Sequence, residues 1–211
     1  MITAQQSSKK IIEYVKTVDV IPVLVVDEPA VAVDLAKVLV DVGLPVLEVT
    51  LRTPKALQVI EKMATVDGAI IAAGTVLNPS HVIDARSAGA DFIVSPGYTD
   101  VLSSSALQAD MPLLPGAATA TEIMQMTALG FSMLKFFPAE TNGGVPALKS
   151  FSGPLPDVSF CPTGGVNRQN LKEYLALANV RCVGGSWLVN QRDLQRRDWE
   201  SIRRKVQAMS R

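Results

Sequence analysis

Short hydrophobic runs, rich in β-branched residues, recur along the chain and alternate with amphipathic segments. The eight runs begin at Ile21, Pro45, Ala69, Phe92, Pro112, Ser132, Ser159 and Val180. Their starts are 20 to 27 residues apart, and each run is hydrophobic almost throughout. Such continuous runs are typical of parallel strands that are buried on both faces. The pattern therefore predicts parallel strands that alternate with helices.

The amphipathic segments carry signals for the beginnings and ends of helices. Pro29 stands near an expected helix start, where its missing N–H costs no hydrogen bond. Asn78 and Thr119 are expected N-caps, because their side chains can accept hydrogen bonds from the first helical N–H groups. Gly43 follows an apolar stretch as an expected C-cap. These signals support helices between the strands.

Eight consecutive strand–helix units, with no linker or change in composition, predict one α/β domain over residues 1–211. The expected architecture is a (β/α)8 TIM barrel, whose usual length begins at about 200 residues. A doubly wound open sheet is the alternative. That fold normally has a G-x-G-x-x-G turn after its first strand, and no such turn follows the run IPVLVV at 21–26.

The two ends of the chain add helices to this repeat. An extra N-terminal helix is predicted within residues 1–20, because Ile11, Val15 and Val18 would lie on one face. We expect it to cover the N-terminal mouth of the barrel. Residues 187–211 are predicted to form a C-terminal helical segment rich in arginine, which we interpret as a solvated helix.

Composition limits the possible functions. The chain has 211 residues, of which 20 are basic and 20 acidic, so it lacks the excess of basic residues that binding to a nucleic-acid backbone needs. A single histidine, His81, excludes a zinc site built from several histidines. No hydrophobic stretch is long enough to span a membrane, and the N-terminus lacks the apolar core of a signal peptide. We therefore expect a cytoplasmic protein without a metal, nucleic-acid or membrane partner.

Lys135 is the only lysine within a predicted strand, in the run FSMLKFFPAE. Burying a charged ammonium among hydrophobic neighbours is costly, so this position favours the neutral amine. A neutral amine is the nucleophile that forms a Schiff base with a ketone. The alternatives are a lysine paired with a carboxylate for structural reasons and one that extends to the rim.

Polar residues alternate in the second run, LEVTLRTP. Glu48, Thr50 and Arg52 have the same parity, so their side chains face one side of the strand. If that side is the barrel interior, a carboxylate near Lys135 could shuttle protons, and the arginine suits a substrate carboxylate. A structural Glu–Arg pair is the alternative. Three charged residues in one interior favour a functional site.

The seventh and eighth runs end in glycine pairs, in CPTGGV and VGGSW. Each pair, Gly164 with Gly165 and Gly184 with Gly185, would leave backbone N–H groups exposed just before a helix. Many barrels bind phosphate after these two strands, and Ser186 could add a hydroxyl donor. We therefore expect a phosphate site here, although glycine is also common in ordinary turns.

Seven motifs follow one another in the order LEVTLRTP, AAGTVLNP, FIVSPG, LLPGAAT, LKFFPAE-NGG, FCPTGG and GGSWLV. Over about residues 21–189 they resemble the class I aldolase family that includes 2-keto-3-deoxy-6-phosphogluconate (KDPG) aldolase, also called 4-hydroxy-2-oxoglutarate aldolase. The resemblance implies a (β/α)8 homotrimer that forms a Schiff base with its substrate. It also implies an enzyme that needs no metal and no other cofactor.

The resemblance assigns roles to residues at the catalytic centre. Lys135 corresponds to the Schiff-base lysine and Glu48 to the general acid/base. Arg52 and Thr75 correspond to residues that hold the pyruvyl carboxylate.

It also assigns roles around the substrate. Pro96 and Phe137 correspond to residues that line the site around the imine, and Thr163 to a residue near the substrate hydroxyls. A threonine there is more similar to the gluconate enzyme than to its 6-phosphogalactonate relative. The positions that correspond to the phosphate site are Gly164, Gly165, Gly184 and Ser186.

The implied reaction is cleavage of KDPG to pyruvate and glyceraldehyde 3-phosphate, and also of 4-hydroxy-2-oxoglutarate to pyruvate and glyoxylate. One alternative is a barrel isomerase or decarboxylase that acts on a phosphorylated sugar, with Glu48 as base and Lys135 as an electrostatic clamp. A non-catalytic phosphosugar-binding protein is another alternative.

Overall fold

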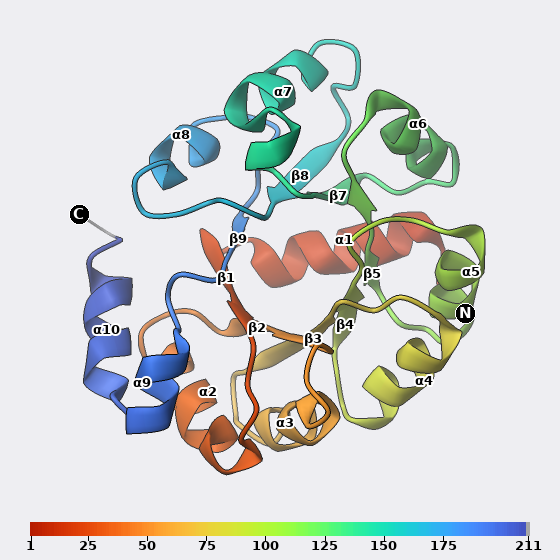
Figure 1. Ribbon diagram of the computed structural model, residues 1–211. Coiled ribbons are helices and arrows are strands. Elements are labelled where there is room, and N and C mark those ends of the chain that lie inside the picture. The colour runs from red at the N-terminus through yellow and green to blue at the C-terminus, as the bar shows by residue number, and fades with distance from the viewer. Residues whose placement is uncertain (210–211) are drawn as a thin grey trace.

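The computed structural model describes residues 1–209 and alternates parallel strands with helices (Figure 1). The strands are β1 (Val20–Leu24), β2 (Val46–Thr50), β3 (Ile70–Gly74), β4 (Phe92–Val94), β5 (Leu113–Leu114), β6 (Gly116–Ala117), β7 (Met133–Phe136), β8 (Ser159–Pro162) and β9 (Val183–Gly185). The α-helices are α1 (Ala4–Val15), α2 (Ala32–Asp41), α3 (Ala56–Met63), α4 (Pro79–Ser87), α5 (Asp100–Gln108), α6 (Ala120–Ala128), α7 (Gly144–Phe151), α8 (Leu171–Leu175), α9 (Gln191–Arg196) and α10 (Trp199–Gln207). Two short 3-10 helices are η1 (Pro29–Val31) and η2 (Glu140–Asn142).

The strands pair in parallel and curl around a common centre (Figure 1). One sheet has the order β5-β4-β3-β2-β1-β9, and the other has the order β6-β7-β8. At one junction, isolated bridges pair Phe160 with Val180 and Thr163 with Gly184. At the other, only Pro115 separates β5 from β6. The molecule is therefore an α/β fold of TIM-barrel type with a curled parallel sheet.

Two expected strands differ in detail from the sequence pattern. The fifth run is divided at Pro115, which has no N–H to donate to a ladder, although its carbonyl accepts a hydrogen bond from Lys135 N at 2.9 Å. The eighth run begins as a strand only at Val183, because Val180 makes a single bridge to Phe160.

Several helix boundaries lie where the sequence places them. Asn78 caps α4 by accepting a hydrogen bond from His81 N, and Thr119 forms a capping box with Glu122 at the start of α6. Gly43 follows α2 with a φ of 85°, the left-handed conformation expected of a C-cap glycine.

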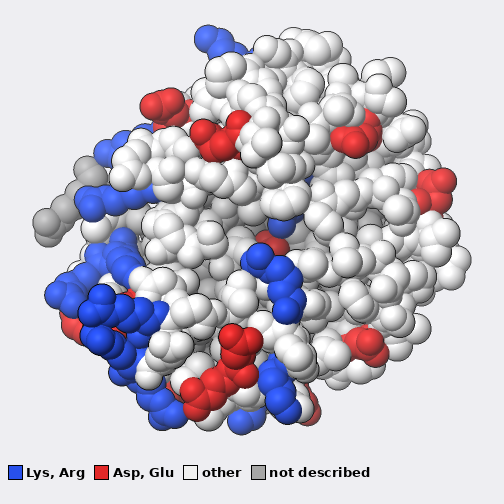
Figure 2. All heavy atoms as spheres, viewed as in Figure 1, with Lys and Arg blue, Asp and Glu red and all other residues white. Residues whose placement is uncertain are grey.

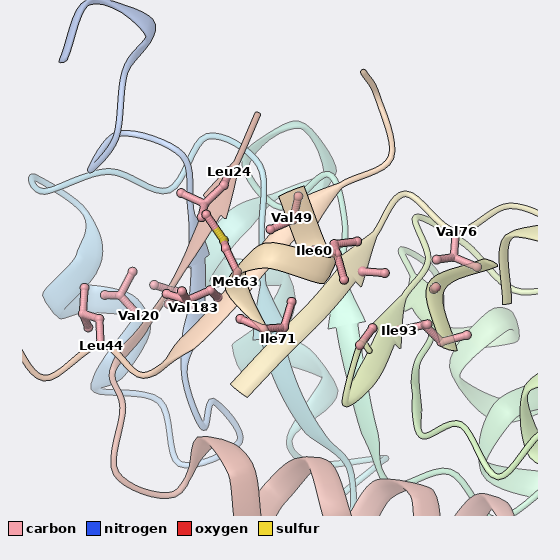
Figure 3. Packing of buried hydrophobic residues seen from close by; sticks show 14 of the residues in the cluster. Val20, Leu24, Leu44, Val49, Ile60, Met63, Ile71, Val76, Ile93 and Val183 are labelled. Atoms are coloured by element: carbon pink, nitrogen blue, oxygen red, sulfur yellow. The ribbon is translucent and has the colours of Figure 1, made fainter. Parts of the chain in front are cut away.

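Alternation along the strands divides the hydrophobic core into two parts. Outward-facing residues such as Val49 and Ile71 pack against Ile60 and Met63 of α3 (Figure 3). Inward-facing residues form a second cluster beneath the carboxyl ends of the strands. Its residues on the strands are Ile21, Val46, Ala72, Phe92, Val94, Leu114, Met133 and Cys161, and Cys182 lies just before β9.

Helix α1 adds Ile11 and Val15 to this inner cluster. Ser8 of α1 accepts hydrogen bonds from the backbone N–H groups of Ser132 and Met133, at the start of β7. Ser7 Oγ accepts a hydrogen bond from Leu113 N at 2.8 Å. The helix thus lies across the amino-terminal ends of the strands, and the functional site must open at the other end.

The C-terminal segment differs from the expected solvated helix. It contains two helices, separated at Arg197, which has a left-handed φ of 52°. Helix α10 buries Ile202 and Val206 and is joined to α2 by the ion pair of Arg203 with Asp41. Residues 210–211 of this prediction lie outside the described part. Within residues 1–209, no helix has the length and hydrophobicity to cross a membrane.

Candidate active site

A cavity of about 310 Å³ opens at the carboxyl ends of the strands. Figure 2 looks onto this face and shows charged side chains of both signs at its centre. The lining residues are Val23, Glu48, Thr50, Arg52, Thr75, Pro96, Lys135, Phe137, Thr163, Gly164, Gly165, Val166, Gly184 and Ser186. The cavity therefore brings together all eleven site residues that the sequence predicts. It also contains Thr50, whose parity matches that of Glu48 and Arg52, and it adds Val23 and Val166.

Lys135 and Glu48 meet at the base of this cavity. Lys135 Nζ lies 3.2 Å from Glu48 Oε1, and the two residues are only 6% and 3% exposed. The amine is also 5.2 Å from the centre of the Phe137 ring. Leu134 and Phe136 belong to the outer core and face away from the amine. The surroundings of the lysine are therefore less apolar than the sequence predicts, because they include the Glu48 carboxylate. A proton can pass directly between Lys135 and Glu48.

Strand β3 provides the space for the Glu48 carboxylate. Gly74 pairs with Thr50 in the ladder, and a Cβ atom at Gly74 would lie 2.4 Å from Glu48 Oε1. Any larger residue at this position would therefore displace the carboxylate. Thr75, the next residue, has a φ of 59°, which is rare for a β-branched side chain. Strained backbone of this kind is concentrated at functional sites.

Arg52 lies at the mouth of the cavity and is held by Thr50. Its Nε donates to Thr50 Oγ1 at 3.2 Å, and that hydroxyl donates to the Leu24 carbonyl at 3.0 Å. Arg52 is exposed, so its guanidinium remains accessible to an incoming carboxylate. The shared parity of Glu48, Thr50 and Arg52 places Thr50 in the cavity, but the sequence did not suggest its contact with the arginine.

Of the two glycine pairs, Gly164, Gly165 and Gly184 line another part of the cavity, whereas Gly185 does not line it. Gly164 and Gly165 have φ values of 98° and 82°, which side chains rarely adopt. A Cβ atom at Gly184 would lie 2.3 Å from Thr163 Oγ1, so this glycine leaves room for the threonine. Ser186 is exposed at the rim.

The expectation that helices follow these glycines directly was wrong. Helix α8 begins at Leu171 and α9 at Gln191, six residues after Gly165 and Gly185. Loop N–H groups, rather than the ends of these short helices, are therefore the backbone donors available beside the cavity.

The two cysteines lie in the inner core, outside the cavity lining. A side-chain hydrogen bond with Cys161, in which the protonated Cys182 thiol is favoured, and then burial raise the pKa of Cys182 well above its ordinary value. Both features favour the unreactive thiol form. Within residues 1–209, no group of three His, Cys, Asp or Glu side chains is arranged to hold a metal ion.

Comparison with known proteins gives consistent similarities over most of the chain. Residues 11–205 match the family model described as KDPG and KHG aldolase. The KHG/KDPG aldolase of Escherichia coli K12 is 48% identical over 184 residues, which cover 87% of this chain and 86% of the relative.

Two solved structures have the same fold and similar sequences. The KDPG aldolase of Legionella pneumophila, with pyruvate captured as a covalent carbinolamine, aligns with a TM-score of 0.89 and 43% identity over 92% of this chain and 95% of that one. The Zymomonas mobilis ZM4 enzyme with 3-phosphoglycerate aligns with a TM-score of 0.88 and 43% identity over 94% of each chain. The chain therefore belongs to the KDPG and KHG aldolase family.

Proposed function

We propose that this protein is a class I aldolase, a lyase that cleaves KDPG to pyruvate and glyceraldehyde 3-phosphate. The observation that carries the proposal is the buried contact of 3.2 Å between Lys135 Nζ and Glu48 Oε1 at the base of the cavity. A lysine needs a neutral amine to attack a ketone, and an adjacent carboxylate can accept its proton. The relative that captures pyruvate as a carbinolamine supports this chemistry.

The first half of the reaction forms the imine. Glu48 accepts a proton from Lys135, and the free amine attacks the C2 carbonyl of KDPG to form a C–N bond. Glu48 gives this proton to the C2 oxygen, takes a second one from the attacking nitrogen and passes it to the same oxygen, which leaves as water. The resulting protonated imine is an electron sink. The short distance between the two side chains lets one carboxylate perform all of these proton transfers.

The second half breaks the C3–C4 bond. Glu48, directly or through a water molecule, removes the proton of the C4 hydroxyl. The C4–O electrons form the aldehyde, and the electrons of the C3–C4 bond move into the imine to give an enamine. The enamine gains a proton at C3, and water then hydrolyses the imine, which releases pyruvate and regenerates Lys135.

The two ends of the substrate are held by different parts of the cavity. Arg52 and Thr75 bind the pyruvyl carboxylate, while Pro96 and Phe137 form the walls around the imine. Thr163 contacts the substrate hydroxyls. Holding both ends positions the bond that breaks, and such orientation can supply several kcal/mol of rate enhancement.

The phosphate is assigned to the glycine loops and to the Ser186 hydroxyl. The lining residues proposed to contact it are Gly164, Gly165, Gly184 and Ser186. The Zymomonas mobilis relative was solved with 3-phosphoglycerate, which supports a phosphorylated substrate for this family member. The E. coli relative is named for both substrates, and we therefore include cleavage of 4-hydroxy-2-oxoglutarate to pyruvate and glyoxylate.

Ser186→Ala should raise the KM for KDPG by about tenfold or more, because one hydrogen bond to a charged group contributes roughly 1.5 kcal/mol or more. The KM for 4-hydroxy-2-oxoglutarate, which has no phosphate, should change little. Steady-state kinetics on both substrates measures the difference. Equal increases for the two substrates would contradict the phosphate assignment.

Reductive trapping tests the proposed function. Borohydride added with pyruvate should reduce the imine and fix the three-carbon unit on Lys135. Trypsin would then fail to cleave after Lys135, so a modified peptide spanning 87–149 should replace two shorter peptides. An unmodified Lys135 peptide would exclude the imine and would favour the alternative function of an isomerase or a decarboxylase.

A coupled lactate dehydrogenase assay for pyruvate distinguishes an enzyme from a phosphosugar-binding protein.

We also infer that residues 1–211 form one domain and that the strands close into an eight-stranded barrel. This count treats β5 and β6 as one strand that is interrupted at Pro115. It also takes two isolated bridges, Phe160 with Val180 and Thr163 with Gly184, as the pairing that joins β8 to β9 and closes the barrel. In this description α1 is the extra helix that covers the N-terminal mouth.

We further propose a cytoplasmic homotrimer. The side formed by α4, α5 and α6 shows few charged residues in Figure 2. Exposed hydrophobic side chains on or next to these helices are Leu77, Ile83, Val101, Met124 and Leu129. Monomers rarely expose many large apolar side chains together, which supports contact with further copies of the chain on this side.

A further inference from the structure

The segment that follows β7 contains polar groups that the proposed mechanism does not use. It belongs to the motif LKFFPAE-NGG and includes η2 (Glu140–Asn142), which precedes α7. The backbone N–H groups of Ala139 and Glu140 donate to the carbonyls of Thr163 and Gly164, at 2.8 and 3.0 Å. This segment is therefore attached directly to the glycine loop beside the cavity.

The Glu140 side chain packs against the same loop. A Cβ atom placed on Gly165 would lie 2.5 Å from Glu140 Cγ, so the side chain occupies the space beside this glycine. Glu140 is otherwise exposed to solvent. The Glu140 carboxylate therefore carries a negative charge close to the glycine loop, and we assign the substrate phosphate to that loop.

Tyr174 holds that carboxylate from the other side. It belongs to α8 and is fully buried, and its hydroxyl donates a hydrogen bond to Glu140 Oε1. Burial and then the Glu140 carboxylate raise the pKa of Tyr174, so the phenol stays protonated and remains a donor. A Cβ atom on Gly144 would lie 3.1 Å from both the Tyr174 hydroxyl and Glu140 Oε1, so this glycine leaves room for the bond.

We propose that Tyr174 is a positioning residue for phosphate recognition: its hydrogen bond to Glu140 keeps the carboxylate from turning toward the N–H groups of the glycine loop. Without this bond, the carboxylate is free to rotate and to compete with the phosphate for the loop donors. Like charges at a close distance also repel each other, which weakens phosphate binding further. The inference rests on the proposed function, because it assigns the substrate phosphate to this loop.

Tyr174→Phe removes only the hydroxyl and should raise the KM for KDPG about five- to tenfold. The KM for 4-hydroxy-2-oxoglutarate and both kcat values should stay within about twofold of the wild type, because this substrate has no phosphate and Tyr174 is not among the residues that line the cavity. Tyr14→Phe is the matched control, because Tyr14 lies on α1 and stacks on Phe92 in the inner core. It should leave all four constants unchanged.

A double variant distinguishes this role from a loss of packing. Adding Glu140→Gln to Tyr174→Phe removes the charge of the released side chain and should restore most of the affinity for KDPG. Failure of this restoration, an unchanged KM for KDPG in Tyr174→Phe, or equal increases in KM for both substrates would overturn the proposal.

If Tyr174→Phe does not fold, Glu140→Asp serves instead. It keeps the charge but shortens the arm, and an unchanged KM for KDPG would again overturn the proposal.

Inorganic phosphate provides a measurement that does not depend on catalysis. Calorimetry should show phosphate binding several-fold more weakly to Tyr174→Phe than to the wild type or to Tyr14→Phe. Equal affinities would overturn the proposal. A wild-type protein that releases no pyruvate from either substrate would instead contradict the proposed function, and the phosphate titration would still decide the role of Tyr174.

Discussion

Lys135→Ala should lower kcat for KDPG cleavage by at least about three orders of magnitude. Catalytic residues act as a unit, so loss of the nucleophile alone removes most of the rate enhancement. No other lysine among the cavity-lining residues can replace it. Borohydride with pyruvate should leave the variant unmodified. The measurements are pyruvate release in the coupled assay and the mass of the trapped protein.

Loss of folding must be separated from loss of chemistry in this variant. Lys135 is the ion-pair partner of Glu48, which is 3% exposed, so the substitution leaves a buried carboxylate without its cation. Circular dichroism should nevertheless show the helical content of the wild type. Lys149→Ala, at the exposed end of α7, is the matched control and should retain full activity. Activity in Lys135→Ala within tenfold of the wild type would exclude the Schiff-base mechanism.

Glu48→Gln should lower kcat by about 10²- to 10⁴-fold, which is the usual contribution of a general acid/base. The amide keeps the size of the side chain, so the space beside Gly74 and the contact with Lys135 can persist. It cannot accept a proton from Lys135 or from the C4 hydroxyl. Single-turnover and steady-state kinetics on KDPG measure the loss.

The two variants should differ in one partial reaction. Glu48→Gln retains the lysine, so borohydride should still trap pyruvate on Lys135, although more slowly than in the wild type. Glu61→Gln, an exposed position on α3, controls for the loss of a carboxylate elsewhere. A Glu48→Gln enzyme with normal kcat would show that another group moves the protons.

Much of this site could be predicted from local patterns. The alternation of strand side chains puts Glu48 and Lys135 in one interior wherever the strands curl around it. The motif resemblance supplied further lining residues, although not Val23 or Val166. The contact of Glu140 with Tyr174 could not be predicted in this way. These two residues are 34 positions apart, and neither lies in a strand or in a strongly periodic segment.

The amino-acid sequence by itself determined the order of strands and helices, because burial on both faces requires continuous hydrophobic runs and because proline, glycine and capping residues restrict the backbone locally. It also determined that Glu48 and Arg52 share one side of their strand. Only the tertiary structure decided how far apart those groups lie. The 3.2 Å contact between Lys135 and Glu48, the space that Gly74 leaves and the support of the glycine loop by Glu140 all depend on how separate strands pack. Such packing is fixed by contacts between residues distant in the chain, which no local pattern specifies.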